Sequence, residues 1–311
     1  MPPIRQPLSD GRWHLQHGPI DLVLGADGEA DAVAAAHAAA WVRFREVLRE
    51  LVAELPLLRQ PVGDEECAFL GPVARRMWQA CRPHRQNFIT PMAAVAGSVA
   101  QEIVAAYQRD GVDRAFVNNG GDIALHLAPG HALRVGVVAD IARPLSAPGR
   151  RPVLDGRFEV SSASGVRGIA TSGWRGRSFS LGIADSVTVL AADAAQADAA
   201  ATVIANAVNA DDARIVRQPA SSLKDDSDLG EIEVTVHVPL LPPSLVQRAL
   251  FLGVQCAREQ RERGLIKAAL LVCQGLATST DTVGIAQALL PLPPGWERGR
   301  CPRPALGSVL A

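Results

Sequence analysis

Four polar side chains lie on one face of a helix predicted between Ala194 and Asn209. These side chains are Asp198, Thr202, Asn206 and Asn209. At about 100° per residue they fall within an arc of roughly 80°, and every other position from 199 to 208 is Ala, Val or Ile. A helix this apolar is expected to be buried, so the polar stripe must face an interior or a cleft, where polar groups need partners. Those partners are either a neighbouring loop or a ligand.

The first two members of the stripe favour a ligand. Asp198 and Thr202 are spaced i, i+4 and therefore present two hard oxygen donors on the same side of the helix. Such donors suit Mg²⁺, which prefers oxygen ligands, keeps several waters and commonly bridges phosphates. The sequence therefore suggests a magnesium site on this helix.

A second candidate is the segment Asn118-Asn119-Gly120-Gly121-Asp122, between two predicted strands. Adjacent glycines allow positive φ angles and can expose backbone N–H groups to an anion or a ring system. The same letters also predict an ordinary hairpin turn. Asn118 and Asp122 add more polar character than a turn requires, so both interpretations stay open.

A third candidate runs from Gly168 to Ser180 and is rich in glycine and hydroxyl groups. With Arg175 and Arg177 it could hold a phosphate through backbone amides and guanidinium groups, although a plain polar loop has the same composition. No G-x-S-x-G motif surrounds Ser172, so a nucleophilic serine is not indicated. The chain also contains neither a Walker A loop nor G-x-G-x-x-G.

Histidines and cysteines point to no metal site or disulfide framework. The seven histidines show no H-x-x-x-H spacing, and the five cysteines show no C-x-x-C. His37, inside an Ala-rich helix, is expected to be structural. The compact basic segment Arg82-Pro83-His84-Arg85 could complement an acidic ligand, but a solvated loop is the simpler interpretation.

Helices and antiparallel strands mix along the chain in a way typical of an α+β fold. Helical periodicity is found at residues 29–55, 71–81, 91–107, 194–209 and 243–263. Pro56 is expected to stop the first of these helices, and Asp193 with Gln196 forms a capping box at the start of the fourth. Strands are predicted at 13–16, 20–24, 114–118, 123–127, 133–138, around an Asp155-Gly156 turn, and at 186–191, 214–217, 231–238 and 265–272. Small residues at 93–100 would let a neighbour approach the third helix closely.

Length and charge fit one domain over residues 1–290 with a disordered tail at 291–311, where Pro, Gly and Arg accumulate. The net charge of -1 and the lack of a basic run argue against nucleic-acid binding. Residues 1–10 show no signal-peptide pattern, and no stretch of about 18 apolar residues occurs. We therefore expect a cytoplasmic protein without a membrane segment.

These segments, in this order, resemble the ApbE-like superfamily, best known for FAD:protein FMN transferases. The resemblance covers residues 90–209 and rests on five segments: Ala93–Ala100, Asn119-Gly120-Gly121-Asp122, Ala170-Thr171-Ser172-Gly173, Ser186-Val187-Thr188-Val189 and Ala197-Asp198-Ala199-Ala200-Ala201-Thr202. It implies a duplicated T-fold with antiparallel sheets and long helices.

The resemblance also implies a site. Asp198 and Thr202 would be catalytic Mg²⁺ ligands, with the Ala96 carbonyl as a third. FAD or FMN would lie against groups in two loops: Asn119, Gly120, Gly121, Asp122, Thr171, Ser172, Gly173, Arg175 and Arg177. A flavoprotein would then be a partner.

Two departures separate this chain from the transferases. In the helix of small residues, the transferases carry Lys-Gly, whereas this chain has Ala96-Gly97. After the Ser-Gly loop, the transferases carry a His-x-x-Asp-Pro-x-x-Gly segment, whereas this chain continues directly with residues 180–185. The chain is therefore most similar to a shortened, largely uncharacterised bacterial and archaeal branch. The departures leave three functions open: a flavin-processing or flavin-binding enzyme related to the transferases, a non-transferase accessory subunit, and an enzyme for another small anionic substrate in a catabolic pathway.

Overall fold

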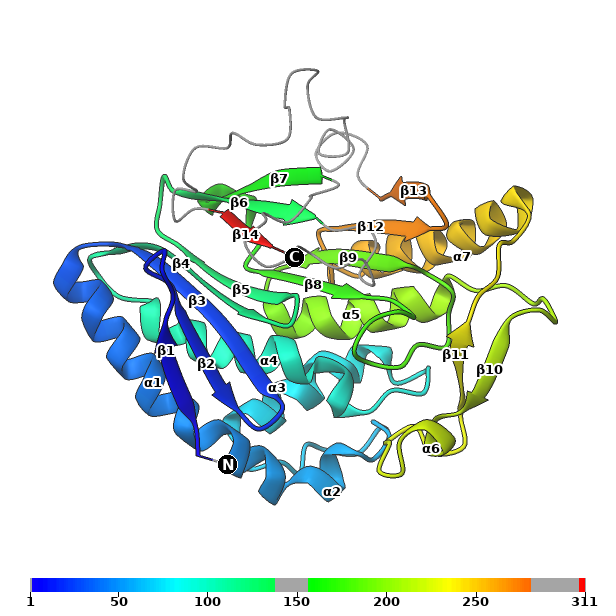
Figure 1. The fold of residues 1–311 in the computed structure, drawn as a ribbon, viewed down its shortest axis with the longest axis horizontal. Helices are drawn as coiled ribbons and strands as arrows, with labels where there is room; N and C mark the ends of the chain where they lie inside the picture. The colour runs from blue at the N-terminus through cyan, green and yellow to red at the C-terminus, as the bar shows by residue number, and fades with distance from the viewer. Residues whose placement is uncertain (1, 138–155, 281–307, 311) are drawn as a thin grey trace, which may run out of the picture.

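The computed structural model describes residues 2–137, 156–280 and 308–310 (Figure 1). Its centre is a nine-stranded sheet in the order β1-β2-β3-β4-β5-β8-β9-β12-β13, in which all neighbouring strands are antiparallel. The strands of this sheet are β1 (Ile4–Pro7), β2 (Trp13–His17), β3 (Ile20–Gly28), β4 (Val112–Asn119), β5 (Asp122–Leu127), β8 (Gly168–Ser172), β9 (Ser186–Ala191), β12 (Ala268–Cys273) and β13 (Leu276–Ser279).

Helices cover one face of this sheet (Figure 1). They are α1 (Ala30–Ala53), α2 (Leu55–Leu58), α3 (Pro72–Cys81) with the 3-10 turn η1 (Arg82–His84), η2 (Pro91–Ala94), α4 (Val95–Val104), η3 (Ala105–Tyr107), α5 (Ala194–Ala207) and α7 (Pro243–Glu262). The short helix α6 (Ala220–Leu223) contacts the β10 strand instead. None of the helices in the described part of the chain is both long enough and apolar enough to span a membrane.

The opposite face of the sheet is covered by a smaller sheet, β14-β6-β7 (Figure 1). It contains β6 (Ala132–Val137), β7 (Gly156–Ser161) and β14 (Ser308–Leu310), and a short 3-10 turn, η4 (Ser162–Ser164), follows β7. β14 is parallel to β6 and belongs to the segment for which we predict a tail. A separate two-stranded ribbon pairs β10 (Val216–Pro219) with β11 (Glu233–His237).

The order of elements in the large sheet repeats. The hairpin β2-β3 is followed by helices ending in α4 and then by the hairpin β4-β5, and the hairpin β8-β9 is followed by α5, α7 and the hairpin β12-β13. Each copy places its second strand beside its third, β3 on β4 and β9 on β12. The α+β class and the duplicated T-fold expected from the resemblance are therefore confirmed.

The two copies meet where α4 crosses α5. A Cβ on Gly97 of α4 would lie 2.2 Å from the carbonyl oxygen of Ala194, so only glycine allows this approach. Ala195 N, at the start of α5, donates to Gln101 Oε1 of α4 at 3.2 Å. The small residues predicted to admit a close neighbour therefore do so, and the neighbour is α5.

Most predicted elements are present, with three corrections. Gly168–Ser172, grouped in the sequence with a polar loop, is the central strand β8, because its Ile169 and Ala170 are buried between β5 and β9. Pro56 does not simply end a helix but lies in the first turn of α2, where its missing N–H costs nothing. The expected closing strand, β12, is followed by an edge strand, β13. The predicted Asp155-Gly156 turn lies partly outside the described residues.

Candidate functional site

The carboxylate of Asp198 joins α5 to the first turn of α4. Asp198 Oδ2 accepts a hydrogen bond from the backbone N–H of Gly97 at 2.8 Å. N–H groups in the first turn of a helix have no partner within that helix and attract negative charge. α5 begins at its own cap, since Asp193 Oδ1 accepts from Gln196 N at 2.9 Å. Asp198 therefore stands on a helix fixed at its start and lies directly against the other copy of the fold.

The rest of the polar stripe divides into two kinds. Asn206 Oδ1 accepts from Leu181 N at 2.9 Å, and Asn209 Nδ2 donates to Leu181 O at 2.9 Å. These two side chains therefore hold the preceding loop, as expected if a neighbouring loop is their partner. The half-buried hydroxyl of Thr202 makes no hydrogen bond to any other described residue. Asp198 and Thr202 are thus the members of the stripe that are left for a ligand.

The β4-β5 hairpin brings a second carboxylate to the same place. Asn119 and Asp122 are paired across a turn in which Gly120 and Gly121 have φ angles of 69° and 117°, as a two-residue hairpin loop requires. Asn118 Oδ1 accepts from Gly121 N at 2.8 Å, so this amide serves the turn itself. The hairpin interpretation is therefore correct, and the turn also directs Asp122 towards β8.

Asp122 is held by the neighbouring strand. Its Oδ1 accepts from Thr171 N at 3.1 Å. The hydroxyl of Thr171 contacts that of Thr188 on β9, with 3.0 Å between the oxygens. Thr171 thus supports Asp122 through its backbone, while its side chain links β8 to β9.

Asp122 and Asp198 form an acidic pair with strongly altered titration. Burial raises the pKa of Asp122 to about 7, although the hydrogen bond from Thr171 N opposes this rise. Burial also raises the pKa of Asp198 well above its usual range, and the nearby charge of Asp122 raises it further. Both side chains keep some solvent-accessible surface. Without a cation, burial and repulsion therefore favour a state in which the two carboxyl groups together keep a proton at neutral pH.

The Ala96 carbonyl lies at the edge of this pair. It accepts a hydrogen bond from Asn119 Nδ2 at 3.1 Å, which ties the β4-β5 turn to the start of α4. A carbonyl oxygen has two lone pairs, and in the first turn of α4 the Ala96 carbonyl also accepts the intrahelical N–H of Ala100, so a cation would have to replace one of these two bonds. Ala96, Asn119, Asp122 and Asp198 are therefore connected through the first turn of α4.

The two arginines predicted to assist are in different places. A Cβ on Gly120 would lie 3.2 Å from Arg177 Nη1, so this exposed guanidinium is beside the β4-β5 turn. Arg175 lies over the ring of Trp174, 4.8 Å from its centroid, and its Nε is 3.9 Å from Asp185 Oδ1. Arg177 therefore lies at the turn, whereas Arg175 lies near the carboxylate of Asp185.

Ser172 and Gly173 leave the sheet next to this region. Ser172, the last residue of β8, is paired with Val187 of β9 and is half-buried. Gly173 is buried against the backbone of Asp185. Of the two residues, only Ser172 therefore keeps side-chain surface for a ligand.

The available oxygens suit a small hard cation. Asp122 Oδ1 and Asp198 Oδ2 accept backbone N–H groups of Thr171 and Gly97, and the backbone N–H of Ala96 also interacts with the Asp198 carboxylate. Thr202 adds a hydroxyl. No cluster of three or more His, Cys, Asp or Glu side chains that could hold a metal occurs within residues 2–137 and 156–280. The donors therefore fit Mg²⁺ with several waters better than Zn²⁺.

Sequence reasoning missed two contributors to this site. The Gly97 amide was noticed only as part of a small-residue surface, and Thr188 only as part of a strand motif. A single helix starting after Thr90-Pro91 predicts unpaired N–H groups only up to about position 95; Gly97 is available because the structure begins α4 at Val95, after the separate turn η2. For Thr188 the sequence carried no signal, because strand register decides that it faces Thr171.

Comparison with known proteins shows the family to which the chain belongs. A family model described as AbpE bacteria matches residues 5–280. The chain belongs to this ApbE-like family. The match begins in β1 and ends one residue after β13, so it includes both copies of the repeated unit and the whole acidic pair.

Among relatives in this family, a UPF0280 protein of Methanopyrus kandleri is 34% identical over 73% of this chain and 89% of its own length. Another, from Methanothrix thermoacetophila, is 38% identical over 55% of this chain and 68% of its own. The solved ApbE protein of Thermotoga maritima shares 13% identity, with a TM-score of 0.44 over 93% of this chain and 99% of that chain.

Proposed function

We propose that this protein is a flavin-processing enzyme that binds FAD with Mg²⁺ at the Asp122–Asp198 pair. The observation that carries the proposal is the pair itself: two closely enclosed carboxylates on different elements, each held in position by backbone N–H groups. A divalent cation would offset the burial that raises both pKa values, and the charge of Asp122 that raises the pKa of Asp198 further. Family membership supplies flavin as the expected ligand.

In this proposal each group has a defined role. Asp198 and Thr202 bind the cation, and the Ala96 carbonyl adds a third oxygen by exchanging its bond from Asn119 for the cation. Arg177 approaches the pyrophosphate beside the Gly120-Gly121 turn, where its charge assists binding. Thr171 holds Asp122 in place.

Other predicted contacts lie at the border of the site. Asn119 fixes the turn through Ala96, and Ser172 and Gly173 form the wall after β8. Arg175 is further from the cation, and we assign it a supporting part through Asp185.

Transfer of FMN to a flavoprotein is the specific reaction that we propose. A Ser or Thr hydroxyl of the acceptor would form a bond to the phosphorus of the FMN half, while the pyrophosphate bond to AMP breaks and the hydroxyl loses its proton. Bound Mg²⁺ would supply charge neutralisation at the pyrophosphate, which is the main requirement of phosphoryl transfer. The residues of the chain would bind and orient the two phosphates.

One observation favours a second candidate, a flavin-binding subunit without transfer. Residues 180–185, which stand where the transferases carry their His-x-x-Asp-Pro segment, are pinned in this chain. Buried Ser180 donates to Asn206 Oδ1 at 3.1 Å, and Ile183 N donates to Val208 O at 2.8 Å. This segment supports α5 and adds no titratable side chain before Asp185.

Our first prediction concerns Mg²⁺-dependent binding of FAD. Isothermal titration should show FAD binding in Mg²⁺ that weakens at least tenfold in EDTA. Asp198→Asn keeps the shape of the side chain but removes its charge, so it should bind FAD equally weakly with or without Mg²⁺. Release of AMP, measured by chromatography, would separate transfer from binding alone.

The matched control is Asp211→Asn, which removes an exposed carboxylate just beyond the same helix. It should retain the Mg²⁺ dependence of the wild type. Failure of the wild-type protein to bind FAD in either condition would refute the proposal. Binding without AMP release in the presence of a Ser/Thr-containing acceptor would instead support the subunit.

A further inference from the structure

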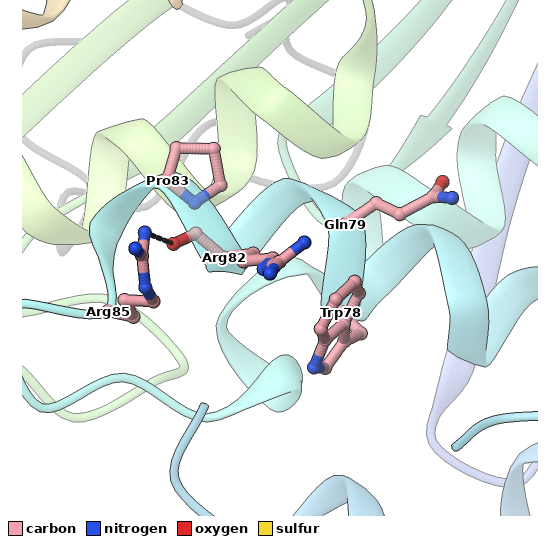
Figure 2. A pocket seen from close by; sticks show the side chains of 5 residues that line it. All are labelled: Trp78, Gln79, Arg82, Pro83 and Arg85. Carbon is pink, nitrogen blue, oxygen red and sulfur yellow. Dashed lines mark hydrogen bonds between the residues drawn. The ribbon is translucent and has the colours of Figure 1, made fainter. Parts of the chain in front are cut away.

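A hollow of about 450 Å³ lies at the end of α3, formed by residues that the proposed function does not use. Its lining consists of Trp78, Gln79, Arg82, Pro83 and Arg85 (Figure 2). These residues include most of the basic segment noted in the sequence. We refer to the feature as the Trp78 hollow.

The hollow is positively charged. Arg82 is exposed and makes no ion pair within 4.0 Å among the described residues, while Arg85 Nε donates to Asp64 Oδ1 at 2.5 Å. Arg263 adds a third guanidinium nearby, since its Nη2 donates to Pro83 O at 2.6 Å. Burial lowers the pKa of His84 to about 4, and the charge of Arg263 contributes to this shift. Of the two guanidinium groups that line the hollow, only that of Arg85 therefore has a carboxylate partner among the described residues, Asp64.

The arrangement of Arg82 is suited to binding rather than to solvation alone. Its guanidinium lies over the Trp78 ring, 4.9 Å from the centroid. Stacking on an aromatic face restricts the guanidinium while leaving its N–H edges available. Arg85 Nη1 donates to the Arg82 carbonyl at 3.4 Å, which keeps the two arginines together (Figure 2).

The hollow is separate from the acidic pair. None of its lining residues contacts Asp122 or Asp198 through a hydrogen bond or an ion pair in the described residues. Cys81, between α3 and η1, is buried towards α5, and the charge of Asp198 helps to raise its pKa. Arg82, the next residue, is exposed on the outer side. The end of α3 therefore lies between the half-buried acidic pair, Asp122 and Asp198, and the exposed basic residues of the Trp78 hollow.

We propose that the Trp78 hollow binds a small organic oxyanion, in which a phosphate or carboxylate group is carried on a flat apolar body. The oxyanion is held by Arg82 and Arg85, whose guanidinium groups match its geometry. The apolar body lies against Pro83 and the edge of the Trp78 ring, since Arg82 covers the face of that ring. The hollow thereby differs from a patch of surface charge, which would bind any anion equally.

The test is an NMR titration of the whole chain carrying Asp198→Asn, in EDTA, so that the acidic pair does not contribute. The indole N–H resonance of Trp78, assigned by its loss in Trp78→Phe, is followed while phenyl phosphate, benzoate or inorganic phosphate is added. We expect a saturable shift with at least one of the aromatic probes and binding of inorganic phosphate that is at least tenfold weaker. The tighter aromatic probe identifies the preferred head group.

Variants define the site. Arg82→Gln with Arg85→Gln should weaken the aromatic probes at least tenfold, while Arg75→Gln, on the exposed side of the same helix, should leave them unchanged. An unmoved Trp78 resonance in all three titrations would overturn the proposal. Equal binding of inorganic and phenyl phosphate would also overturn it, because the hollow would then be a charged surface only. Neither result bears on Mg²⁺ and FAD, which are tested at the other site.

Discussion

At the scale of residues, the central feature is a carboxylate pair whose members depend on one another. Asp122 is supported by Thr171 N and Asp198 by Gly97 N, so each has one oxygen fixed in position. This geometry holds two like charges close together in a poorly solvated place. The pair is consequently unfavourable when both groups are ionised and no cation is bound.

The second prediction is that the metal-free protein loses stability as the pH rises. Asp122 has a pKa of about 7 in the folded chain against 3.8 ordinarily, so the folded state retains a proton that the unfolded chain releases above about pH 4. The free energy of unfolding should therefore fall by about 1–3 kcal/mol between pH 4 and 7 through this group, and then level off. Urea denaturation in EDTA at several pH values measures this slope.

Asp122→Asn cannot titrate and should flatten the slope. The exposed loop substitution Asp225→Asn should leave it as in the wild type. If Asp122→Asn and the wild type have parallel pH profiles, the carboxylate is not enclosed as described.

At the scale of elements, the crossing of α4 and α5 sets the position of the pair. The third prediction is that Gly97→Ala destabilises the protein by about 1–3 kcal/mol, because its methyl group would overlap the Ala194 carbonyl and push the helices apart. The displaced α5 should also weaken any Mg²⁺-dependent ligand binding. Urea denaturation and titration calorimetry measure the two effects.

Gly63→Ala is the matched control. Its added methyl group would meet only the carboxylate of Glu65, the mobile end of an exposed side chain. It should therefore change the free energy of unfolding by less than about 0.5 kcal/mol. Equal effects of the two substitutions would show that the helix crossing tolerates more space than its geometry indicates.

Sequence patterns predicted elements better than they predicted the contacts between them. Hydrophobic periodicity and capping residues are sufficient to predict α1, α3, α5 and α7, because interactions between residues close in the sequence decide where helices begin and end. β8 was assigned to a loop, since its Gly168-Ile-Ala-Thr-Ser letters are buried only by strands distant in the chain. For the same reason the stripe on α5 predicted a buried polar face but not that Asn206 and Asn209 serve a loop.

At the scale of the whole molecule, the two copies of the repeated unit share one sheet and one helix crossing. The fourth prediction is that they unfold together. Hydrogen-exchange mass spectrometry across a guanidinium titration should give peptides from α4 and α7 the same midpoint, because β5-β8 pairing and the α4–α5 contact join the copies.

Gly97→Ala tests this coupling directly. It should move both midpoints by the same amount, although the substitution lies in the first copy only. A shift confined to α4 would mean that the copies are independent folding units.

Duplication usually creates two equivalent sites, and this chain departs from that symmetry. Asp122 begins the fourth strand of the first copy, and Asp198 lies five residues after the cap of a helix in the second. The corresponding places are Leu276, which begins β13, and Ala34, five residues after the Glu29 cap of α1. The counterpart position therefore has no carboxylates. The two copies therefore contribute to the acidic pair differently: the first presents a strand end and the second a helix face, while the reciprocal positions hold the half-buried Leu276 and the exposed Ala34.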